Sequence, residues 1–308
     1  MWAMQGNNNK TLTRFLQYIP IFIGLMLGRL MPFKVRGAFF AALGGFFVPR
    51  ISGSRNRIIS GLKLVYPDMS EADALKLCKK ISQNAGRTLS EILFNAGYKN
   101  RLDLFDAQGP GLDVLRAAKA EGKGAIIVSA HFGQWEAIRH FMKSQEMETG
   151  AVYRENSNPW YEQDFLNGIE QGGLPIVAKS SSGNIKMVRH LRKGGFFALL
   201  VDQKFQSGHL MPFLGHDALT PTAAAELALR YDLPLVPAFG TRDENGVNIH
   251  IEFEPVIEHT DAITMTQEVN DRISARILAH PEQWYWLHKR WDDIFLYEEL
   301  HGDKAKKT

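Results

Sequence analysis

A histidine follows a short apolar run, and the residues around it are of types that can transfer protons. The run is Ala125–Ala130, His131 comes next, Gly133 lies two residues on, and Glu136 lies five residues on. An imidazole held at one nitrogen by a carboxylate has a fixed tautomer and a free second nitrogen that can accept a proton. Five residues correspond to about 140° on a continuous helix. Contact therefore requires that His131 precede the helix and that Glu136, in its first turn, fold back.

The position of this histidine in the expected fold allows two roles, a catalytic one and that of a hydrogen-bonded structural residue. His131 ends an expected strand, and open α/β sheets build their sites at the carboxyl ends of strands. Gly133 allows close approach of the backbone to a ligand, and a helix starting near Gln134 presents free N–H groups. We expect His131 and Glu136 to form a base that deprotonates a hydroxyl or amine for attack on an acyl group. The Gly133 amide and the helix N-terminus would meet the oxyanion.

Strand and helix patterns alternate along most of the chain. Strands are expected at 125–130, 150–154, 174–178, 195–202, 233–239 and 247–255. Helices are expected at 71–98, with Ser70 as N-cap, and at 160–171, 182–193, 221–231 and 265–279. Continuous apolar strands between helices predict an α/β fold, a mixed central sheet flanked by helices. The period-two pattern of 247–255 predicts a half-exposed or edge strand.

The N-terminal segment is strongly apolar but too interrupted for an ordinary membrane span. Pro20 and Arg29 break the run 15–33, so the uninterrupted part covers only about half of the roughly 20 residues that a spanning helix needs. Seven basic residues surround it: Arg14, Arg29, Lys34, Arg36, Arg50, Arg55 and Arg57. An apolar face with a basic rim predicts a helical membrane anchor that lies in the interface or enters one leaflet. A buried helical hairpin of a soluble protein is the alternative.

We therefore expect three parts: a membrane-associating helical segment at 1–50, an α/β domain at 51–300 and a charged tail at 301–308. The net charge is only +3, which does not indicate a nucleic-acid partner. Cys78 is the only cysteine, so an intrachain disulfide and a thiolate metal site are both excluded.

Several ordered blocks resemble one known family. "HFGQWE" (131–136) resembles the H-x4-E signature of the late lipid A acyltransferases, the lauroyl and myristoyl transferases of Gram-negative bacteria. That branch is related to the glycerolipid acyltransferases, which carry H-x4-D. Further blocks match in order: "RIISGLKLVYPDMS", "VYRENSNP", "LLVDQ", "MPFLGHDALTPT" and "PEQWYWLHKRW". The resemblance runs from about Arg57 to Trp291. Ala223 departs from it, because a glycine commonly follows threonine-proline-threonine in the family.

The resemblance implies a reaction and its partners. An acyl chain would pass from acyl carrier protein to a hydroxyl of a membrane lipid, with His131 as general base, Glu136 as its orienting partner, and no metal or organic cofactor. The acceptor would be a lipid A precursor, and the enzyme would work at the cytoplasmic face of the bacterial inner membrane, as a monotopic protein or through a single short anchor. The alternative acceptor is a lyso-aminolipid or another lyso-lipid.

Other residues are candidates for substrate binding. The expected set is Gly133, Gln134, Arg154, Asn158 and Asp202. Arg154 ends a strand and can bind a phosphate or carboxylate bidentately, or pair with Asp202. Asp202 can hold Arg154, position the neighbours of His131, or cap the following turn. Asn158 precedes a proline and is also a turn residue in its own right.

Two further regions allow either a structural or a binding role. The basic residues Lys186, Arg189, Arg192 and Lys193 form a solvated helix face or a docking surface for acyl carrier protein or anionic lipid. The tryptophans of "QWYWLHKRW" form core or a membrane-interface belt. His288 and Arg290 in that block are candidates for binding the polar head of the lipid.

Two other functional classes stay open. A metal hydrolase could use His131, Glu136, Asp202 and His209, although H-x4-E is not the H-E-x-x-H pair of zinc enzymes. A non-catalytic lipid-binding or scaffold protein would keep the groove but tolerate His131→Ala.

Overall fold

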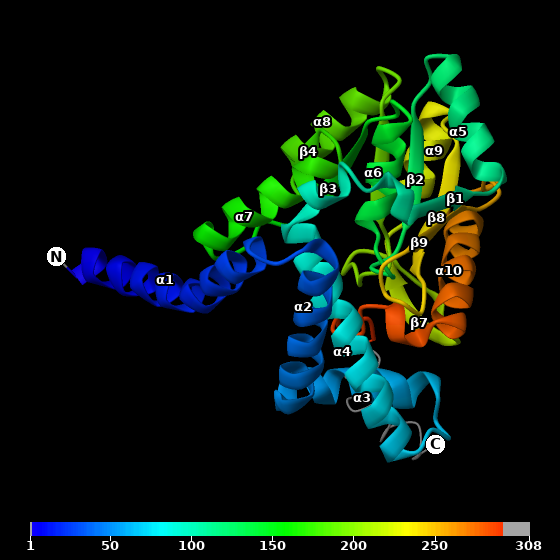
Figure 1. Ribbon diagram of the computed structural model, residues 1–308. Coiled ribbons are helices and arrows are strands. Elements are labelled where there is room, and N and C mark those ends of the chain that lie inside the picture. The colour runs from blue at the N-terminus through cyan, green and yellow to red at the C-terminus, as the bar shows by residue number, and fades with distance from the viewer. Residues whose placement is uncertain (1, 292–308) are drawn as a thin grey trace.

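A seven-stranded sheet with helices on both faces forms the body of the molecule (Figure 1). The structure is a computed structural model that describes residues 2–291, with side chains from residue 12 onward. The expected charged tail, 301–308, lies outside the described residues. The helices are α1 (Trp2–Arg29), α2 (Phe33–Phe47), α3 (Ser52–Val65), α4 (Glu71–Leu93), α5 (Pro110–Ala120), α6 (Glu136–Ser144), α7 (Pro159–Ile169), α8 (Ser181–Leu191), α9 (Ala223–Tyr231) and α10 (Ala262–Ala279). Short 3-10 turns are η1 (Val48–Arg50), η2 (Asn95–Tyr98), η3 (Leu102–Leu104), η4 (Glu170–Gly172) and η5 (Pro281–Gln283).

The sheet is mostly parallel, which confirms the expected mixed α/β sheet. Its strands are β1 (Phe105–Gln108), β2 (Ala125–Ser129), β3 (Thr149–Tyr153), β4 (Ile176–Ala178), β5 (Phe196–Leu200), β8 (Leu235–Arg242) and β9 (Ile249–Phe253). Their spatial order is β1-β9-β8-β2-β5-β3-β4, and only the β8–β9 pair is antiparallel. A separate antiparallel hairpin joins β6 (His209–Phe213) to β7 (His216–Thr220).

The six expected strands are all present, but two features were missed. Strand β1 has only four residues, two of them polar and exposed, so no apolar run marks it. Because β1 pairs with β9, the strand expected at 247–255 is not an edge, although its alternating exposure is confirmed. The β6–β7 hairpin lies in a region for which no strand was expected.

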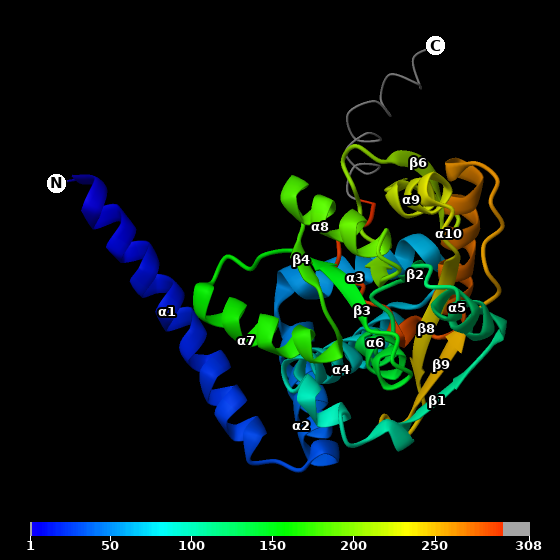
Figure 2. The same cartoon turned by 90° about the horizontal axis from the view of Figure 1, so that it is seen from above.

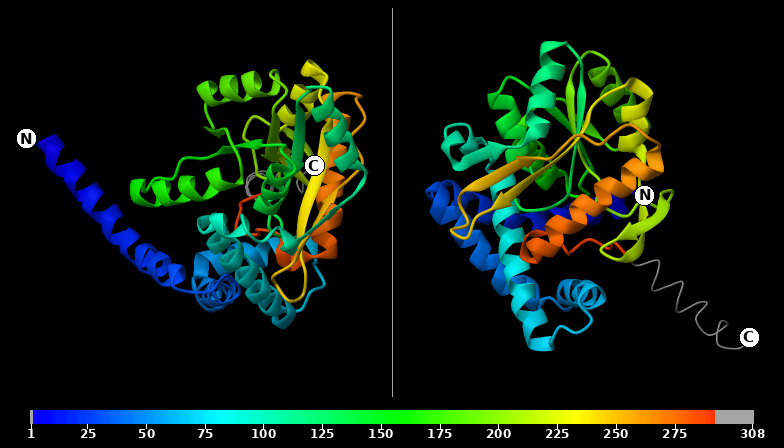
Figure 3. Two further views of the ribbon diagram at one scale, coloured as in Figure 1. Left: turned by 45° about the horizontal axis from the view of Figure 1, so that its top comes forward. Right: turned by 90° about the vertical axis from the view of Figure 1, so that its right-hand side faces the viewer.

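Strand β2 is buried on both faces and divides the core into two clusters. Ile126 and Val128 point into a cluster with residues of α8, α9 and α10. Ala125 and Ile127 point into the opposite cluster with α5 and α6. The helices therefore form a layer on each face of the sheet, as seen in Figures 2 and 3. This arrangement explains why the strand is continuously apolar rather than alternating.

Helices α2 and α4 cross with their backbones almost in contact. A Cβ atom built on Gly44 would lie 2.3 Å from the carbonyl oxygen of Ser82, and one on Gly86 would lie 2.4 Å from that of Phe40. Glycine on each helix is thus a requirement of the crossing, and α4 in turn contacts η5 below the sheet.

Helix α1 extends away from the body and meets it through α7 (Figures 1 and 2). The rings of Phe15 and Trp160 are 5.3 Å apart, and the Tyr18 hydroxyl donates a hydrogen bond to Asp164. Much of its apolar surface is exposed: Leu12, Phe15, Leu16, Ile19, Ile21, Phe22, Ile23, Met26 and Leu27. None of the helices within residues 2–291 has the length and apolarity needed to cross a membrane.

The helix crossing gives a stability prediction. Gly44→Ala should lower the free energy of unfolding by about 1–3 kcal/mol, because the added methyl overpacks a backbone contact. Gly53→Ala on α3 is the control, since a Cβ there meets nothing within 4 Å. Denaturant unfolding of the two variants would measure the difference, and an equal effect of both would contradict the close crossing.

Candidate active site

Two neighbouring parallel strands bring His131 and Asp202 together. In the β2–β5 register Ser129 lies opposite Leu200, so the residues two positions further on leave the sheet side by side. The Nδ1 atom of His131 is 2.8 Å from Oδ1 of Asp202. The sequence left the role of Asp202 open. In the structure its carboxylate contacts the imidazole of His131 directly.

The Asp202 carboxylate is completely buried and has three donors around it. Its Oδ2 accepts hydrogen bonds from the His131 backbone N–H at 2.9 Å and from Trp284 Nε1–H at 2.8 Å. Burial by itself raises the pKa of Asp202, but the charge and hydrogen bond of His131, with His288 and Trp284, lower it well below its usual value. The ionised carboxylate accepts the Nδ1 proton, so the free lone pair of His131 is on Nε2.

A glutamine and a second histidine surround that free nitrogen. The amide nitrogen of Gln203 is 3.3 Å from His131 Nε2 and 2.9 Å from His288 Nε2. The two imidazole rings are 4.6 Å apart, and the Trp135 ring is 5.1 Å from that of His131. Burial, with the His131 charge, lowers the pKa of His288 to about 4, so this second ring is neutral at pH 7.

The loop after His131 is fixed from behind by the backbone. Gly133 has φ +54°, and a Cβ atom there would lie 2.0 Å from the carbonyl oxygen of Gly240. Its N–H donates to the Gln283 carbonyl at 2.9 Å, and its own carbonyl accepts from Thr88. The expected oxyanion role of the Gly133 N–H is not supported, because this group already has a partner. The Gln134 N–H likewise donates to Gly240.

Gln134 belongs to a buried polar network rather than to a substrate surface. Its side chain donates to Glu91 at 2.7 Å and to the Tyr98 hydroxyl at 3.3 Å, and it is fully buried. Glu91 also pairs with Arg242 through two hydrogen bonds of 3.1 and 2.7 Å. The network joins α4, the end of β8 and the loop after His131. The role of Gln134 in substrate binding stays a prediction, and in this structure its side chain is fully engaged within the protein.

Glu136 does not make the contact expected of it. It is the first residue of α6, and its carboxylate is buried against Arg139 at 2.7 Å, with the Asn95 amide at 3.4 Å. Arg139 also donates to the carbonyls of Thr149 and Ile169. Glu136 thus holds Arg139 between α6, β3 and α7, and Asp202 occupies the place beside the imidazole. His131 does precede the helix, as the contact would require, but the Glu136 carboxylate is bonded to Arg139 instead.

The two remaining candidates have different environments. Arg154 follows β3, is exposed, and forms no ion pair within residues 12–291, so the alternative pair with Asp202 is not made. Asn158 caps α7 by accepting from the Trp160 N–H at 3.2 Å, and its amide donates to the Arg14 carbonyl of α1 at 2.7 Å. Arg154 stays available to a ligand, whereas Asn158 is used in joining two helices.

Sequence reasoning missed part of the site. Gln203 directly follows Asp202, and Trp284 was considered only as core or as part of an interfacial belt. Tyr285 donates its N–H to the His131 carbonyl at 2.9 Å. No local pattern reveals these residues, because the contacts join segments about 80 and 150 positions apart. Arg290, a candidate for lipid binding, is buried and donates to Leu219 and Thr220.

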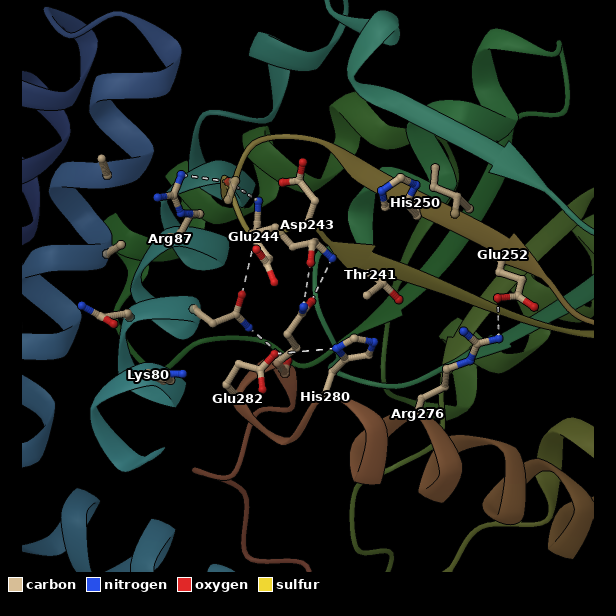
Figure 4. Close-up of a pocket in the computed structure, with 18 of the residues that line it drawn as sticks. Lys80, Arg87, Thr241, Asp243, Glu244, His250, Glu252, Arg276, His280 and Glu282 are labelled. Atoms are coloured by element: carbon tan, nitrogen blue, oxygen red, sulfur yellow. Dashed lines mark hydrogen bonds and ion pairs between the residues drawn. The ribbon is translucent and has the colours of Figure 1, made fainter. Parts of the chain in front are cut away.

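A large cavity elsewhere does not contain the histidine. It measures about 990 Å³ and lies between α4, the β8–β9 turn and the end of α10 (Figure 4). Labelled residues from opposite walls include Lys80, Arg87, Asp243 and Glu244. The His131 cluster is the stronger candidate for the chemistry, because it has a buried carboxylate bonded to an imidazole with a free nitrogen. The cavity has no such pair.

Within residues 12–291, no three or more His, Cys, Asp or Glu side chains are arranged to hold a metal ion. His209, a member of the alternative metal set, lies on β6 opposite Thr220, in the separate hairpin. The geometry thus gives the metal-hydrolase interpretation no support.

Comparison with known proteins finds one matching family and several relatives. The sequence model of a family described as "Bacterial lipid A biosynthesis acyltransferase" matches residues 7–293. The chain is 27% identical to the lipid A biosynthesis lauroyltransferase of Escherichia coli K12 over 74% of its length and 76% of the relative. It is 22% identical to a lipid A biosynthesis acyltransferase of Haemophilus influenzae over 88% and 87% of the two chains. It is also 25% identical to a phosphatidylinositol mannoside acyltransferase of Mycobacterium tuberculosis, over 59% and 58%.

The buried network predicts a large stability effect. Glu91→Ala should lower the free energy of unfolding by about 3–5 kcal/mol, because it leaves the Arg242 guanidinium buried without its counter-ion. Asp113→Ala is the control: its pair with Arg116 is exposed and should contribute at most about 1 kcal/mol. Denaturant unfolding would compare them, and similar small losses would show that the network does not hold the loop.

Proposed function

The chain belongs to the family of bacterial lipid A biosynthesis acyltransferases and is therefore an acyltransferase. From that premise we propose that it moves a fatty acyl chain from the thioester of acyl carrier protein to a hydroxyl of a lipid A precursor. The observation that carries the proposed mechanism is the 2.8 Å bond between His131 Nδ1 and the fully buried Asp202.

The proposed mechanism uses these two side chains. His131 Nε2 removes the proton of the acceptor hydroxyl as its oxygen attacks the thioester carbonyl carbon. The tetrahedral intermediate collapses, the C–S bond breaks, and the proton on Nε2 passes to the departing thiolate. Asp202 is a positioning residue that keeps Nε2 unprotonated before the attack and stabilises the imidazolium during it. Glu136, expected in that role, acts in this proposal only through the placement of α6.

The charge around the site supports an anionic acceptor. Arg154 is exposed at the end of β3, and Lys179 follows β4 at the same edge of the sheet, with its ammonium 4.7 Å from the Phe205 ring. Arg57 donates to the Leu287 carbonyl beside His288. Three cations near the carboxyl ends of the strands suit a phosphorylated glycolipid. A lyso-aminolipid or another lyso-lipid is the second candidate acceptor.

The N-terminal helices support membrane association. We propose that residues 1–50 lie against the cytoplasmic face of the inner membrane, as a monotopic anchor. The exposed apolar face of α1, flanked by Arg14 and Arg29, suits the boundary between lipid headgroups and acyl chains. Helix α7 links this surface to the site: Trp160 packs on α1, and the pKa of the adjacent Tyr161 is raised to about 12 by burial and by Tyr285.

The donor assignment rests on charge as well as family. The residues Lys186, Arg189, Arg192 and Lys193 of α8 and its end are exposed and form no ion pair within the described part of the chain. An acidic carrier protein could dock on this face by electrostatic complementarity.

The assignment of the positioning carboxylate is testable. Asp202→Asn should lower the rate of acyl transfer about 10²–10⁴-fold, the contribution of a general base held in the correct state. Glu136→Gln should lower mainly the melting temperature, because Glu136 pairs with Arg139. Steady-state acyl transfer and thermal unfolding would be measured on both. If Glu136→Gln loses activity as strongly as Asp202→Asn while its melting temperature is unchanged, the assignment to Asp202 is wrong.

The acceptor is testable by mass. Purified protein in detergent would receive acyl-loaded carrier protein with either a lipid A precursor or a lyso-aminolipid, and His131→Ala would serve as control. We expect an acyl mass gain on the lipid A precursor and none with the variant. Gain on the lyso-aminolipid alone would replace the proposed acceptor, and activity of His131→Ala would reject the mechanism.

A further inference from the structure

Two consecutive residues that follow β5, Asp202 and Gln203, contact the two ring nitrogens of His131. Asp202 binds Nδ1 at 2.8 Å, and the Gln203 amide lies 3.3 Å from Nε2. The mechanism proposed above needs Nε2 free, yet in this structure a side chain of the enzyme itself stands at that atom.

The hydrogen-bond directions follow from the groups involved. A glutamine amide has two N–H donors, and a neutral imidazole has one nitrogen with a lone pair. Gln203 therefore donates one hydrogen to Nε2 of His131 and the other to Nε2 of His288, at 2.9 Å. The bond to His288 is the shorter, and His288 belongs to the buried C-terminal segment, whereas Gln203 is exposed. The amide can thus release His131 while it stays attached to His288.

We infer that Gln203, held by His288, is a cap on the catalytic nitrogen that the acceptor hydroxyl must displace. This inference rests on the proposed acyl transfer. While the cap is in place, the lone pair of His131 accepts a hydrogen from the amide rather than from a solvent water. An acceptor hydroxyl that docks beside the ring takes the place of the amide, and Gln203 turns about its bond to His288.

The cap restrains a competing reaction. A water that gave its proton to His131 Nε2 could attack the thioester carbonyl, break the C–S bond and release a free fatty acid and the carrier thiol. The products are those of simple hydrolysis, and the proton that Nε2 took from the water passes to the thiolate. Occupying Nε2 until the lipid hydroxyl arrives therefore favours transfer over hydrolysis. His288 is a positioning residue in this scheme, because it acts through Gln203.

The first test measures hydrolysis without an acceptor. Gln203→Leu keeps much of the volume but removes both N–H donors, and His288→Phe keeps the ring but removes the acceptor. Each should increase release of fatty acid from acyl carrier protein by about fivefold, the effect of losing one typical hydrogen bond. Gln171→Leu, an exposed substitution on η4, is the matched control and should leave release unchanged. Unchanged or reduced release with both site variants, at unchanged melting temperature, would overturn the cap.

The second test needs no donor or acceptor lipid. Diethyl pyrocarbonate acylates the unprotonated nitrogen of imidazole, and mass spectrometry of peptides reports the rate at each histidine. Labelling of His131 should accelerate about fivefold in Gln203→Leu, because the lone pair loses its partner. An unaltered rate would reject the cap even if the protein transfers no acyl chain. Faster labelling in a protein that transfers no acyl chain would retain the cap and reject the proposed function.

Discussion

The buried charge of Asp202 is the constraint on which the site depends. A carboxylate without solvent contact must be neutralised by donors from the protein, and three are present: the ring and the backbone of His131 and the indole of Trp284. These donors come from the end of β2 and from the segment after η5, so compensating the charge also brings the C-terminal block over the sheet. The tautomer of His131, its orientation and the position of Tyr285 and His288 all follow from that one requirement.

The loop after His131 is held on its other side by contacts that have no direct part in proton transfer. The absence of a side chain at Gly133 lets the backbone of β8 pack close to the loop. Gln134 connects the loop to the buried pair of Glu91 and Arg242. The carboxylate of the H-x4-E pattern belongs to this supporting side, because Glu136 binds Arg139. The pattern thus combines a residue placed to react with residues that fix where it stands.

The helical N-terminal part relates the site to a lipid substrate. Helix α1 exposes an apolar face and is joined to α7 by Phe15, Tyr18 and the Asn158 side chain. Tyr161 of α7 interacts electrostatically with Tyr285, whose ring is 6.4 Å from that of His131. Only helix α7 would therefore separate a lipid at the apolar face of α1 from the His131 site. This arrangement suits an acceptor that does not leave the membrane.

The sequence by itself determined six strands of the mixed sheet, the helices that alternate with them and the apolar N-terminus, because these depend on local periodicity; it missed β1 and the β6–β7 hairpin. It also singled out His131 as a candidate, because a potentially reactive residue ends a strand there. It also determined the family, through six blocks in order. Only the tertiary structure decided which carboxylate binds His131. Asp202 and Glu136 were both near strand ends or helix starts, and the choice depended on the β2–β5 register and on where α6 begins. The contacts of Gln203, Trp284 and His288 were decided in the same way, because each joins residues far apart in the chain, and no local pattern records such a pairing.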